Sequence, residues 1–231
     1  MLSLSNLESY YGRSQILHGV DLTADEKSIL VVLGRNGVGK TTLLKSILGL
    51  TDRSTGTITL DGVNITESDT HLRARSGIAY VPQGRHIIPD FTIRENIVMG
   101  SFAASEPSSK VPDIVEELFP YLIENLERPG GVLSGGQQQQ LASARALAAN
   151  PKVILMDEPT EGIQPNIVEQ IENTIIRLNS ELGLLIVLVE QNVGFARRAG
   201  HSFAMLENGR VVEAGSIASL TDDVVNQHMT I

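Results

Sequence analysis

The sequence predicts an α/β fold built around a mainly parallel sheet with helices on both faces. Two observations carry this prediction. Short apolar segments of strand length alternate with segments of helical spacing, over residues 28–48 and again over residues 153–189. Between these regions, residues 92–150 have a mostly helical pattern, which we interpret as an insertion into the core.

The first part of the chain is predicted to be rich in β-structure around one helix. Residues 1–27 read as short strands and turns, and residues 28–33 form an apolar β-rich run that stops at a glycine. Helical spacing over residues 41–48 also ends at a glycine, a typical helix stop. Residues 56–62 alternate polar and apolar side chains and close on Asp-Gly, which is typical of a hairpin, and residues 78–81 form a further strand.

The last third of the chain returns to alternating strands and helices. Residues 153–156 and 184–189 are apolar runs of the buried-strand type, and an amphipathic helix over residues 167–182 separates them. Two short strands then flank Asn208-Gly209, the strongest short-range hairpin signal. This order of elements favours βα units that contribute to one parallel sheet.

Composition excludes several classes of protein. The 231 residues include no cysteine, which rules out disulfides, cysteine–zinc sites and thiol chemistry. The net charge of −9 disfavours a general nucleic-acid binder, which is usually basic. The start of the chain lacks the pattern of a signal peptide, and the longest apolar run, residues 184–189, is far shorter than the roughly 20 residues that cross a bilayer. We therefore expect a cytosolic chain whose membrane role would come through a partner.

A phosphate-binding loop follows the run of residues 28–33. The segment from Gly34 to Thr41 matches G-x-x-x-x-G-K-[ST] and lies between a strand and a helix, the context that this motif requires. Its glycines let successive backbone N–H groups point at phosphate oxygens, and the start of the helix adds a positive dipole end. We expect Lys40 to reach the β- and γ-phosphates, Thr41 to bind Mg²⁺ and Thr42 to contact the α-phosphate. The predicted ATP-binding residues of this loop are Gly34, Asn36, Gly37, Gly39, Lys40, Thr41 and Thr42.

Two adjacent carboxylates end the apolar run of residues 153–156. In P-loop ATPases the acidic residue at this strand end holds Mg²⁺, and we assign that role to Asp157. Glu158 follows it and is predicted to orient and deprotonate the attacking water. An acidic turn after a strand is common by itself. Its occurrence in one chain with the phosphate loop favours an ATPase.

A second glycine-rich motif, Leu133–Gln137, resembles the signature of ABC ATPases. Physically it is another phosphate grip, because a serine hydroxyl, two flexible glycines and a helix start come together. One nucleotide does not need two grips in one chain. The resemblance implies that the second grip closes on the ATP of a partner subunit, through Ser134, Gly135, Gly136 and Gln137.

The resemblance to ABC transporter nucleotide-binding subunits covers essentially the whole chain. It implies a P-loop NTPase fold, with a RecA-like core, an N-terminal antiparallel β subdomain and an inserted α-helical subdomain. We accordingly expect one nucleotide-binding domain over residues 1–231. Residues 1–91 and 151–231 would form the core and β subdomain, and residues 92–150 the helical signature subdomain.

Two further positions match residues that handle nucleotide in this family. Gln83 matches the glutamine that contacts Mg²⁺ and the attacking water, in a loop that touches the membrane subunit. Tyr11 matches the aromatic residue that stacks on adenine, and Tyr10 is the competing candidate. Stacking of this kind tolerates sequence variation and contributes about 1–3 kcal/mol.

The chain departs from the family pattern at two positions. Gln191 stands where the family usually has a switch histidine, and Gln164 stands where an aspartate usually follows the catalytic glutamate. Gln191 can still donate a hydrogen bond to a γ-phosphate, but it cannot become a cation. The implied catalytic residues are therefore Glu158, Lys40, Gln83 and Gln191, and the implied metal ligands are Thr41, Gln83 and Asp157.

These departures also indicate a branch of the family. The segment from Val189 to Asn192 resembles the ATPases of urea and branched-chain amino-acid importers, as do residues 82–85 and 118–120. Gln83, the glutamines at 137–140 and residues 157–165 look more like the urea branch. We therefore hypothesise urea as the solute, with branched-chain amino acids as the alternative.

The resemblance implies several partners: membrane permeases, a second ATPase subunit of the same or a sister chain and, indirectly, an extracytoplasmic solute-binding protein. The chain would then lie at the cytoplasmic face of the inner membrane. Three alternatives remain: a non-transport ABC ATPase acting on nucleic acid or ribosomes, a P-loop kinase for a small molecule, and a non-catalytic regulatory subunit. The acidic net charge counts against the first alternative, and the signature motif counts against the second. The third is disfavoured because Lys40, Asp157 and Glu158 are all present.

Overall fold

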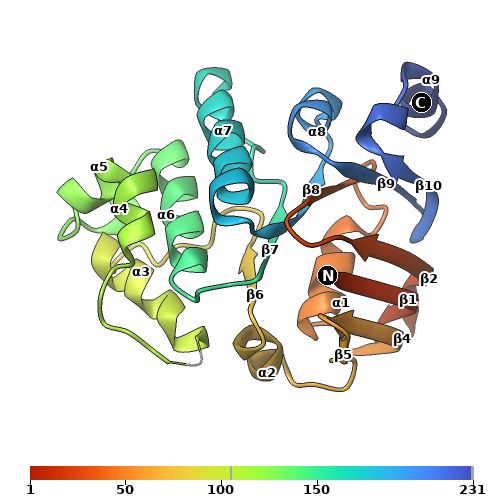
Figure 1. The fold of residues 1–231 in the computed structure, drawn as a ribbon, viewed down its shortest axis with the longest axis horizontal. Helices are drawn as coiled ribbons and strands as arrows, with labels where there is room; N and C mark the ends of the chain where they lie inside the picture. Colours follow the sequence, from red (N-terminus) through yellow and green to blue (C-terminus); the bar gives the residue numbers. More distant parts are fainter. Residues whose placement is uncertain (105, 230–231) are drawn as a thin grey trace.

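The computed structural model describes residues 1–104 and 106–229. Within them, a six-stranded sheet of order β10-β9-β3-β8-β7-β6 forms the centre of the molecule (Figure 1). Its neighbouring strands run parallel, except for the antiparallel pair β9 and β10. This confirms the predicted α/β fold. The strands are β3 (Ile29–Leu33), β6 (Ile78–Val81), β7 (Val153–Asp157), β8 (Leu185–Glu190), β9 (Ser202–Glu207) and β10 (Arg210–Ser216).

A second, antiparallel sheet has the strand order β2-β1-β4-β5. Its strands are β1 (Leu2–Tyr11), β2 (Ser14–Ala24), β4 (Arg53–Leu60) and β5 (Val63–Asn64). The first two strands are long, whereas the sequence predicts short strands there. The difference has a physical cause: the register of β1 shifts between Leu4 and Leu7, where Asn6 adopts a positive φ of 47°. This irregularity breaks the two-residue alternation by which a long strand is recognised.

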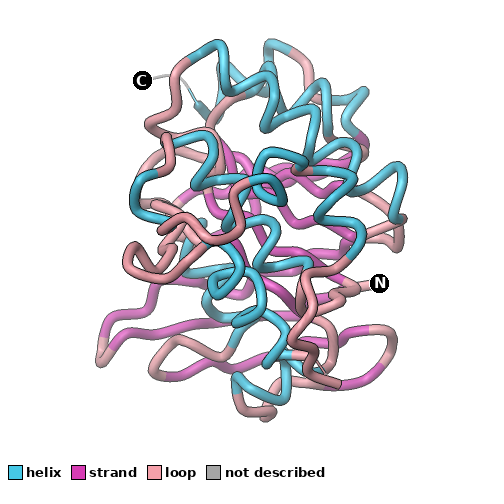
Figure 2. The backbone as a smooth tube through the Cα atoms, turned by 90° about the vertical axis from the view of Figure 1, so that its left-hand side faces the viewer, coloured by secondary structure: helices cyan, strands magenta, loops and turns pink. Residues whose placement is uncertain are grey.

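Apolar side chains cover both faces of the central sheet. In β3, Ile29, Val31 and Leu33 pack toward one side, whereas Leu30 and Val32 pack toward the other. The first side is covered by α6 (Gly135–Leu147), α7 (Pro165–Leu182) and α8 (Val193–Ala199). The second is covered by α1 (Lys40–Leu48) and the antiparallel sheet. Figure 2 shows this layering, with helices gathered above the strands of the central sheet and further strands at the bottom.

The region between β6 and β7 is largely helical, as the sequence predicts. Figure 1 places it at the left, on the far side of the molecule from the antiparallel sheet. Its buried side chains, such as Ile97 and Val115, belong to the same apolar core as the central sheet. The division at residues 92 and 150 therefore remains a prediction. The remaining elements are α2 (Thr70–Arg75), α3 (Ile93–Gly100), η1 (Ser101–Ala103), α4 (Asp113–Leu118), α5 (Pro120–Glu124), η2 (Gly130–Val132), η3 (Ile217–Ser219) and α9 (Asp222–Met229).

Over the described residues, no helix has both the length and the apolar character needed to cross a membrane.

Candidate functional site

The loop between β3 and α1 has the backbone that the phosphate-binding motif requires. Gly37 and Gly39 adopt φ angles of 81° and 109°, in the left-handed region that glycine tolerates best. The loop is held from outside, because the Gly209 N–H donates to the Val38 carbonyl at 2.9 Å. Helix α1 then starts at Lys40, so its free N–H groups face the concave side of the loop.

A cavity of 290 Å³ lies in front of this loop. It is lined by side chains from the antiparallel sheet, the phosphate loop, the segment after β6 and the end of β7. Most of the residues predicted to bind nucleotide within one chain meet here. The lining residues are Tyr11, Ile16, Asn36, Gly37, Gly39, Lys40, Thr41, Thr42, Gln83 and Glu158.

Lys40 is buried and turned back onto its own loop. Its ammonium group donates to the carbonyls of Gly34 and Arg35 at 2.8 and 3.0 Å. It also pairs with Glu158 at 3.0 Å, and both side chains are less than a tenth exposed. A triphosphate would compete with Glu158 for this cation, because charge-assisted contacts to phosphate are strong.

Asp157 meets two hydroxyl groups beside the phosphate loop. Thr41 donates to one carboxylate oxygen and Tyr80 to the other, each at 3.1 Å. Burial raises the pKa of Asp157, and the two hydrogen bonds oppose that shift. Burial likewise raises the pKa of the Tyr80 hydroxyl. The hydroxyl of Thr41 and the carboxylate of Asp157 form a hard oxygen pair of the kind that fits Mg²⁺ bound jointly with phosphates.

Gln191 lies against Glu158. Its amide nitrogen is 3.1 Å from both carboxylate oxygens of Glu158 and 2.7 Å from the side-chain oxygen of Asn36. Glu158 itself has a positive φ of 44°, an uncommon conformation for a residue with a side chain. Gln191 therefore connects the predicted base to the phosphate loop.

The structure separates the two tyrosine candidates. Tyr11 lines the cavity, whereas the Tyr10 hydroxyl donates to Glu8 at 2.8 Å. The Arg53 guanidinium lies over the Tyr10 ring, with its Cζ atom 4.0 Å from the ring centroid. Gln83 also lines the cavity, but its amide donates to Glu161 at 2.6 Å. A contact of Gln83 with Mg²⁺ and water would require it to leave that carboxylate, and it stays a prediction.

The signature segment has a different setting. Ser134 is the N-cap of α6 in a capping box, in which Gln137 accepts from the Ser134 N–H at 3.0 Å. Within the described residues, the phosphate-loop cavity takes no lining residue from this segment. A Cβ atom added to Gly136 would lie 2.2 Å from the Cγ2 methyl of Ile167, whereas the nearest atom to one added to Gly135 would be on Arg85 at 3.4 Å. Gly136 therefore has a packing role inside the chain, which the sequence did not reveal.

Sequence reasoning missed three residues next to the site, namely Tyr80, Thr160 and Glu190. Tyr80 binds Asp157, and Thr160 donates to Glu190 at 2.8 Å behind the predicted base. The available signal was weak: each is a polar residue at or just beyond the end of an apolar strand, close to a predicted site residue in sequence.

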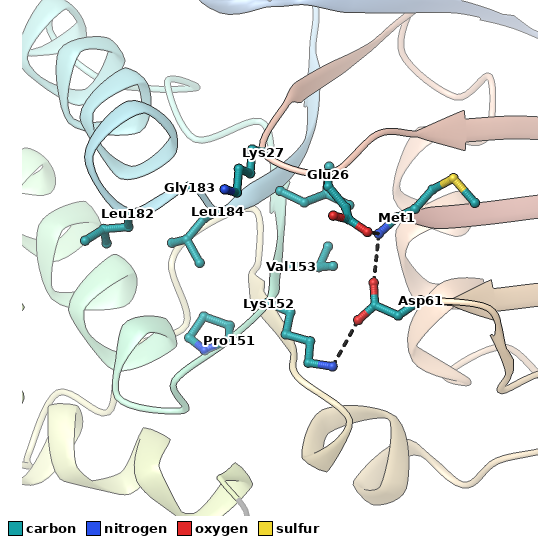
Figure 3. Close-up of a pocket in the computed structure, with 11 residues that line it drawn as sticks. Met1, Glu26, Lys27, Asp61, Pro151, Lys152, Val153, Leu182, Gly183 and Leu184 are labelled. Atoms are coloured by element: carbon teal, nitrogen blue, oxygen red, sulfur yellow. Dashed lines mark hydrogen bonds and ion pairs between the residues drawn. The ribbon is translucent and has the colours of Figure 1, made fainter.

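A second cleft, of 330 Å³, lies at the opposite ends of the parallel strands, where β7 and β8 begin (Figure 3). Asp61 accepts there from the Met1 amino group at 2.8 Å and pairs with Lys152 at 2.9 Å. The first of these contacts is the main cause of the lowered pKa of Asp61. These paired charges join the antiparallel sheet to the central sheet.

The phosphate loop, the Thr41 hydroxyl paired with the Asp157 carboxylate, and the second carboxylate of Glu158 beside them are the arrangement expected of a P-loop ATPase site. The chain belongs to the ABC transporter family, because the family model described as "ABC transporter" matches residues 17–161. This confirms the predicted membership and the predicted ABC-type ATPase.

The similar proteins include ATP-binding proteins of amino-acid transport. The chain is 39% identical over 221 residues to the high-affinity branched-chain amino acid transport ATP-binding protein BraG of Pseudomonas aeruginosa, covering 95% of this chain and 94% of that protein. It is 37% identical over 223 residues to the probable branched-chain amino acid transport ATP-binding protein LivF of Archaeoglobus fulgidus, covering 96% and 94%. These relatives agree with an ABC importer ATPase and do not specifically support urea.

Among solved structures, the fold matches a dimeric post-hydrolysis state of an ATP-binding cassette bound to ADP and Pi. The TM-score is 0.80 at 28% identity, over 94% of this chain and 99% of that one. A nucleotide-free cassette from an ABC transporter matches with a TM-score of 0.82 at 22% identity, over 100% and 95%, which concerns the fold alone.

Proposed function

We propose that this chain binds Mg-ATP and hydrolyses it in a sandwich of two ATPase subunits, which drives solute import through membrane permeases. One observation carries the proposal. The phosphate loop and Glu158 line one cavity at the carboxyl ends of the parallel strands, and Asp157 and Gln191 hydrogen bond to Thr41 and Glu158 of that lining. Groups that bind phosphate, fit a divalent cation and accept a proton are thus within reach of one γ-phosphate.

The ion pair in this site suggests how nucleotide prepares the base. When a triphosphate occupies the loop, Lys40 turns from Glu158 to the β- and γ-oxygens. Glu158 is then free to accept a proton from water. The Gln191 amide, which now donates to Glu158 at 3.1 Å, would donate to the γ-phosphate instead. Mg²⁺, held by Thr41 and Asp157, would neutralise charge on the phosphates.

The signature segment supports the two-subunit arrangement. Its serine and helix start lie apart from the cavity of their own chain, so they are available to a nucleotide on a partner. The dimeric cassette bound to ADP and Pi, to which this chain is similar, agrees with such an arrangement. The partner subunit is a second copy of this chain or a sister ATPase.

An apolar cleft of 300 Å³ supports a contact with the permeases. It lies between α1, α2, α3 and α6, beside the strand that leads to Gln83. Large apolar side chains on its borders are exposed to solvent: Leu50 to 49% and Phe102, close by in η1, to 66%. Exposed apolar surface around a concave site is typical of a protein contact. We infer that a permease helix docks here, which would hold the chain at the cytoplasmic face of the membrane. The cleft is lined by Leu48, Leu50, Thr70, Ala74, Ile78, Ala79, Tyr80, Met99, Gly100, Ala103, Arg145, Ala146 and Ala149.

For the solute we propose urea, delivered by an extracytoplasmic binding protein. The support is the resemblance at Gln83, at the glutamines 137–140 and at residues 157–165. Branched-chain amino acids are the second candidate, because both relatives above serve their transport. The solute does not meet this subunit, so these residues are informative through their fit to a permease.

Uptake measurements separate the two solutes. Deleting the gene should abolish uptake of labelled urea at low external concentration and leave leucine uptake intact, and re-expressing the wild-type chain should restore it. Lost leucine uptake with intact urea uptake would contradict the urea proposal. A pull-down would test whether the chain is a transporter subunit at all. Co-purification with membrane subunits is expected for either solute, whereas co-purification with nucleic acid would indicate an ABC ATPase that serves no transporter.

A further inference from the structure

Glu190 is a buried carboxylate that the proposed chemistry does not use. It is the last residue of β8, which lies between β3 and β7 in the sheet. Only 3% of its surface is exposed, and burial raises its pKa. A carboxylate in such a place is costly unless several donors satisfy it.

Hydrogen-bond donors from two different loops meet this carboxylate, including both the hydroxyl and the backbone N–H of Thr160. The Thr160 hydroxyl donates to one oxygen at 2.8 Å. The backbone N–H groups of Gln191 and Asn192 approach the other oxygen at 3.1 and 3.4 Å. An ionised carboxylate suits this set, because each oxygen acts as an acceptor.

The two loops that Glu190 joins carry the proposed catalytic pair. Thr160 follows Glu158 by two residues, and Gln191 follows Glu190 directly. The Glu158 N–H also donates to the Val189 carbonyl at 3.0 Å, so the backbones of the two loops meet beside the carboxylate. Asn192 extends the connection, since its side chain caps α8 by accepting from Phe195 N–H at 3.0 Å.

We infer that Glu190 is a positioning residue for ATP hydrolysis, and this inference rests on the proposed function of Glu158. By tying Thr160 to the backbone at 191–192, Glu190 keeps Gln191 within hydrogen-bond distance of Glu158. Glu190 does not line the nucleotide cavity, and its contacts above include none with the phosphate loop. Its loss should therefore disturb the alignment of the base and leave nucleotide affinity intact.

The test uses two nearly isosteric variants, Glu190→Gln and Thr160→Val, and one variant, Thr160→Ser, that keeps the hydroxyl. Glu190→Gln has one acceptor oxygen, so it cannot accept from both loops at once. Thr160→Val removes only the hydroxyl, and Thr160→Ser keeps it. We expect Glu190→Gln and Thr160→Val each to lower kcat about 10- to 100-fold, as small misplacements of catalytic groups do. Thr160→Ser should remain near wild type.

Thr174→Val provides a matched control. Thr174 lies on α7 and donates to the Gln170 carbonyl within its own helix, away from the site. This variant should keep the wild-type kcat. ATP affinity measured by titration calorimetry should stay within about twofold of wild type for all four variants, because the contacts of Lys40 are untouched.

Coupling between the two positions distinguishes positioning from a general loss of stability. If Thr160 acts through Glu190, the double variant should lose no more activity than the more damaged single variant. Losses that multiply, wild-type kcat in either single variant, or a fall in ATP affinity that accounts for the lost rate would each overturn the inference. Thr160→Val alone decides the matter if Glu190→Gln does not fold. Failure of the proposed function has a separate signature: Glu158→Gln would hydrolyse ATP as fast as wild type.

Discussion

The contact between Gly136 and Ile167 leads to a prediction about stability. In Gly136→Ala, the new methyl group would start 2.2 Å from the Cγ2 atom of Ile167, well inside the separation of carbon atoms in contact. The Cγ2 methyl of Ile167 cannot rotate out of the way freely, because a β-branched side chain in a helix strongly prefers one χ1 rotamer. Helices α6 and α7 must therefore move apart, or the isoleucine must leave its preferred rotamer.

The expected magnitude combines two opposing effects. Overpacking of this kind costs about 1–3 kcal/mol, and replacing a helical glycine with alanine returns at most about 1 kcal/mol. With the full return subtracted, we expect the free energy of unfolding to fall by up to about 2 kcal/mol. In a domain of this size that corresponds to a decrease in Tm of up to about 8 °C.

Gly135→Ala is the matched control, because it adds the same methyl group one residue earlier in α6. Its nearest neighbour would be the flexible end of Arg85 at 3.4 Å, an ordinary contact. Urea unfolding followed by circular dichroism should show this variant at or above wild-type stability. Adding Ile167→Ala to Gly136→Ala should relieve the overlap, so the double variant should lose less than the sum of the single losses. Equal stability of Gly136→Ala and Gly135→Ala would refute the reasoning.

Four further outcomes are expected. Glu158→Gln should bind ATP, nearly stop phosphate release and elute as a dimer with Mg-ATP in gel filtration; wild-type turnover would remove Glu158 from its role. Lys40→Ala should weaken ATP binding about 10- to 100-fold by calorimetry, since it removes a charged hydrogen-bond donor, and unchanged affinity would contradict that assignment. Tyr11→Ala should weaken ATP binding by about 1–3 kcal/mol while the control Tyr10→Ala does not, and a reversed order would move the stacking role to Tyr10. Burial raises the pKa of Asp157 above its ordinary value of 3.8, so the folded state binds more protons than the unfolded state, and the contribution of Asp157 to stability falls as pH rises from about 4. Without nucleotide, Asp157→Asn should therefore have a higher Tm than wild type at pH 7. A lower Tm would contradict the direction of this pKa shift.

Much of the site could be read from local sequence because its chemistry is local. In the phosphate loop, the glycines and the Lys40-Thr41 pair lie within one strand–turn–helix unit, so their spacing dictates both backbone shape and side-chain direction. The hairpin at Asn208-Gly209 is equally local, and both residues adopt the positive φ angles, 44° and 72°, that this turn requires. The carboxylate pair was recognisable because it ends a buried strand.

Relations between distant segments could not be read in this way. The choice between Tyr10 and Tyr11 depends on where β1 ends relative to the phosphate loop, and Arg53 on β4 is what occupies the Tyr10 ring. The lengths of β1 and β2 were also underestimated, because a bulge at Asn6 interrupts the alternation. The alternation of polar and apolar residues predicts that strands exist, but it does not predict that a strand continues through a bulge.

The sequence alone determined the fold class, the ATP-binding loop, the acidic pair and the family, since each depends on residues close together in the chain. Only the tertiary structure decided that Lys40 pairs with Glu158, that Gly136 must admit Ile167 and that Glu190 joins two loops. The physical reason is strand order. Because β7 and β8 are neighbours in the sheet, their carboxyl ends bring Glu158 and Thr160 against Glu190 and Gln191, across some thirty residues of intervening chain. Side-chain contacts at such range follow from packing of the whole core, which no local pattern encodes.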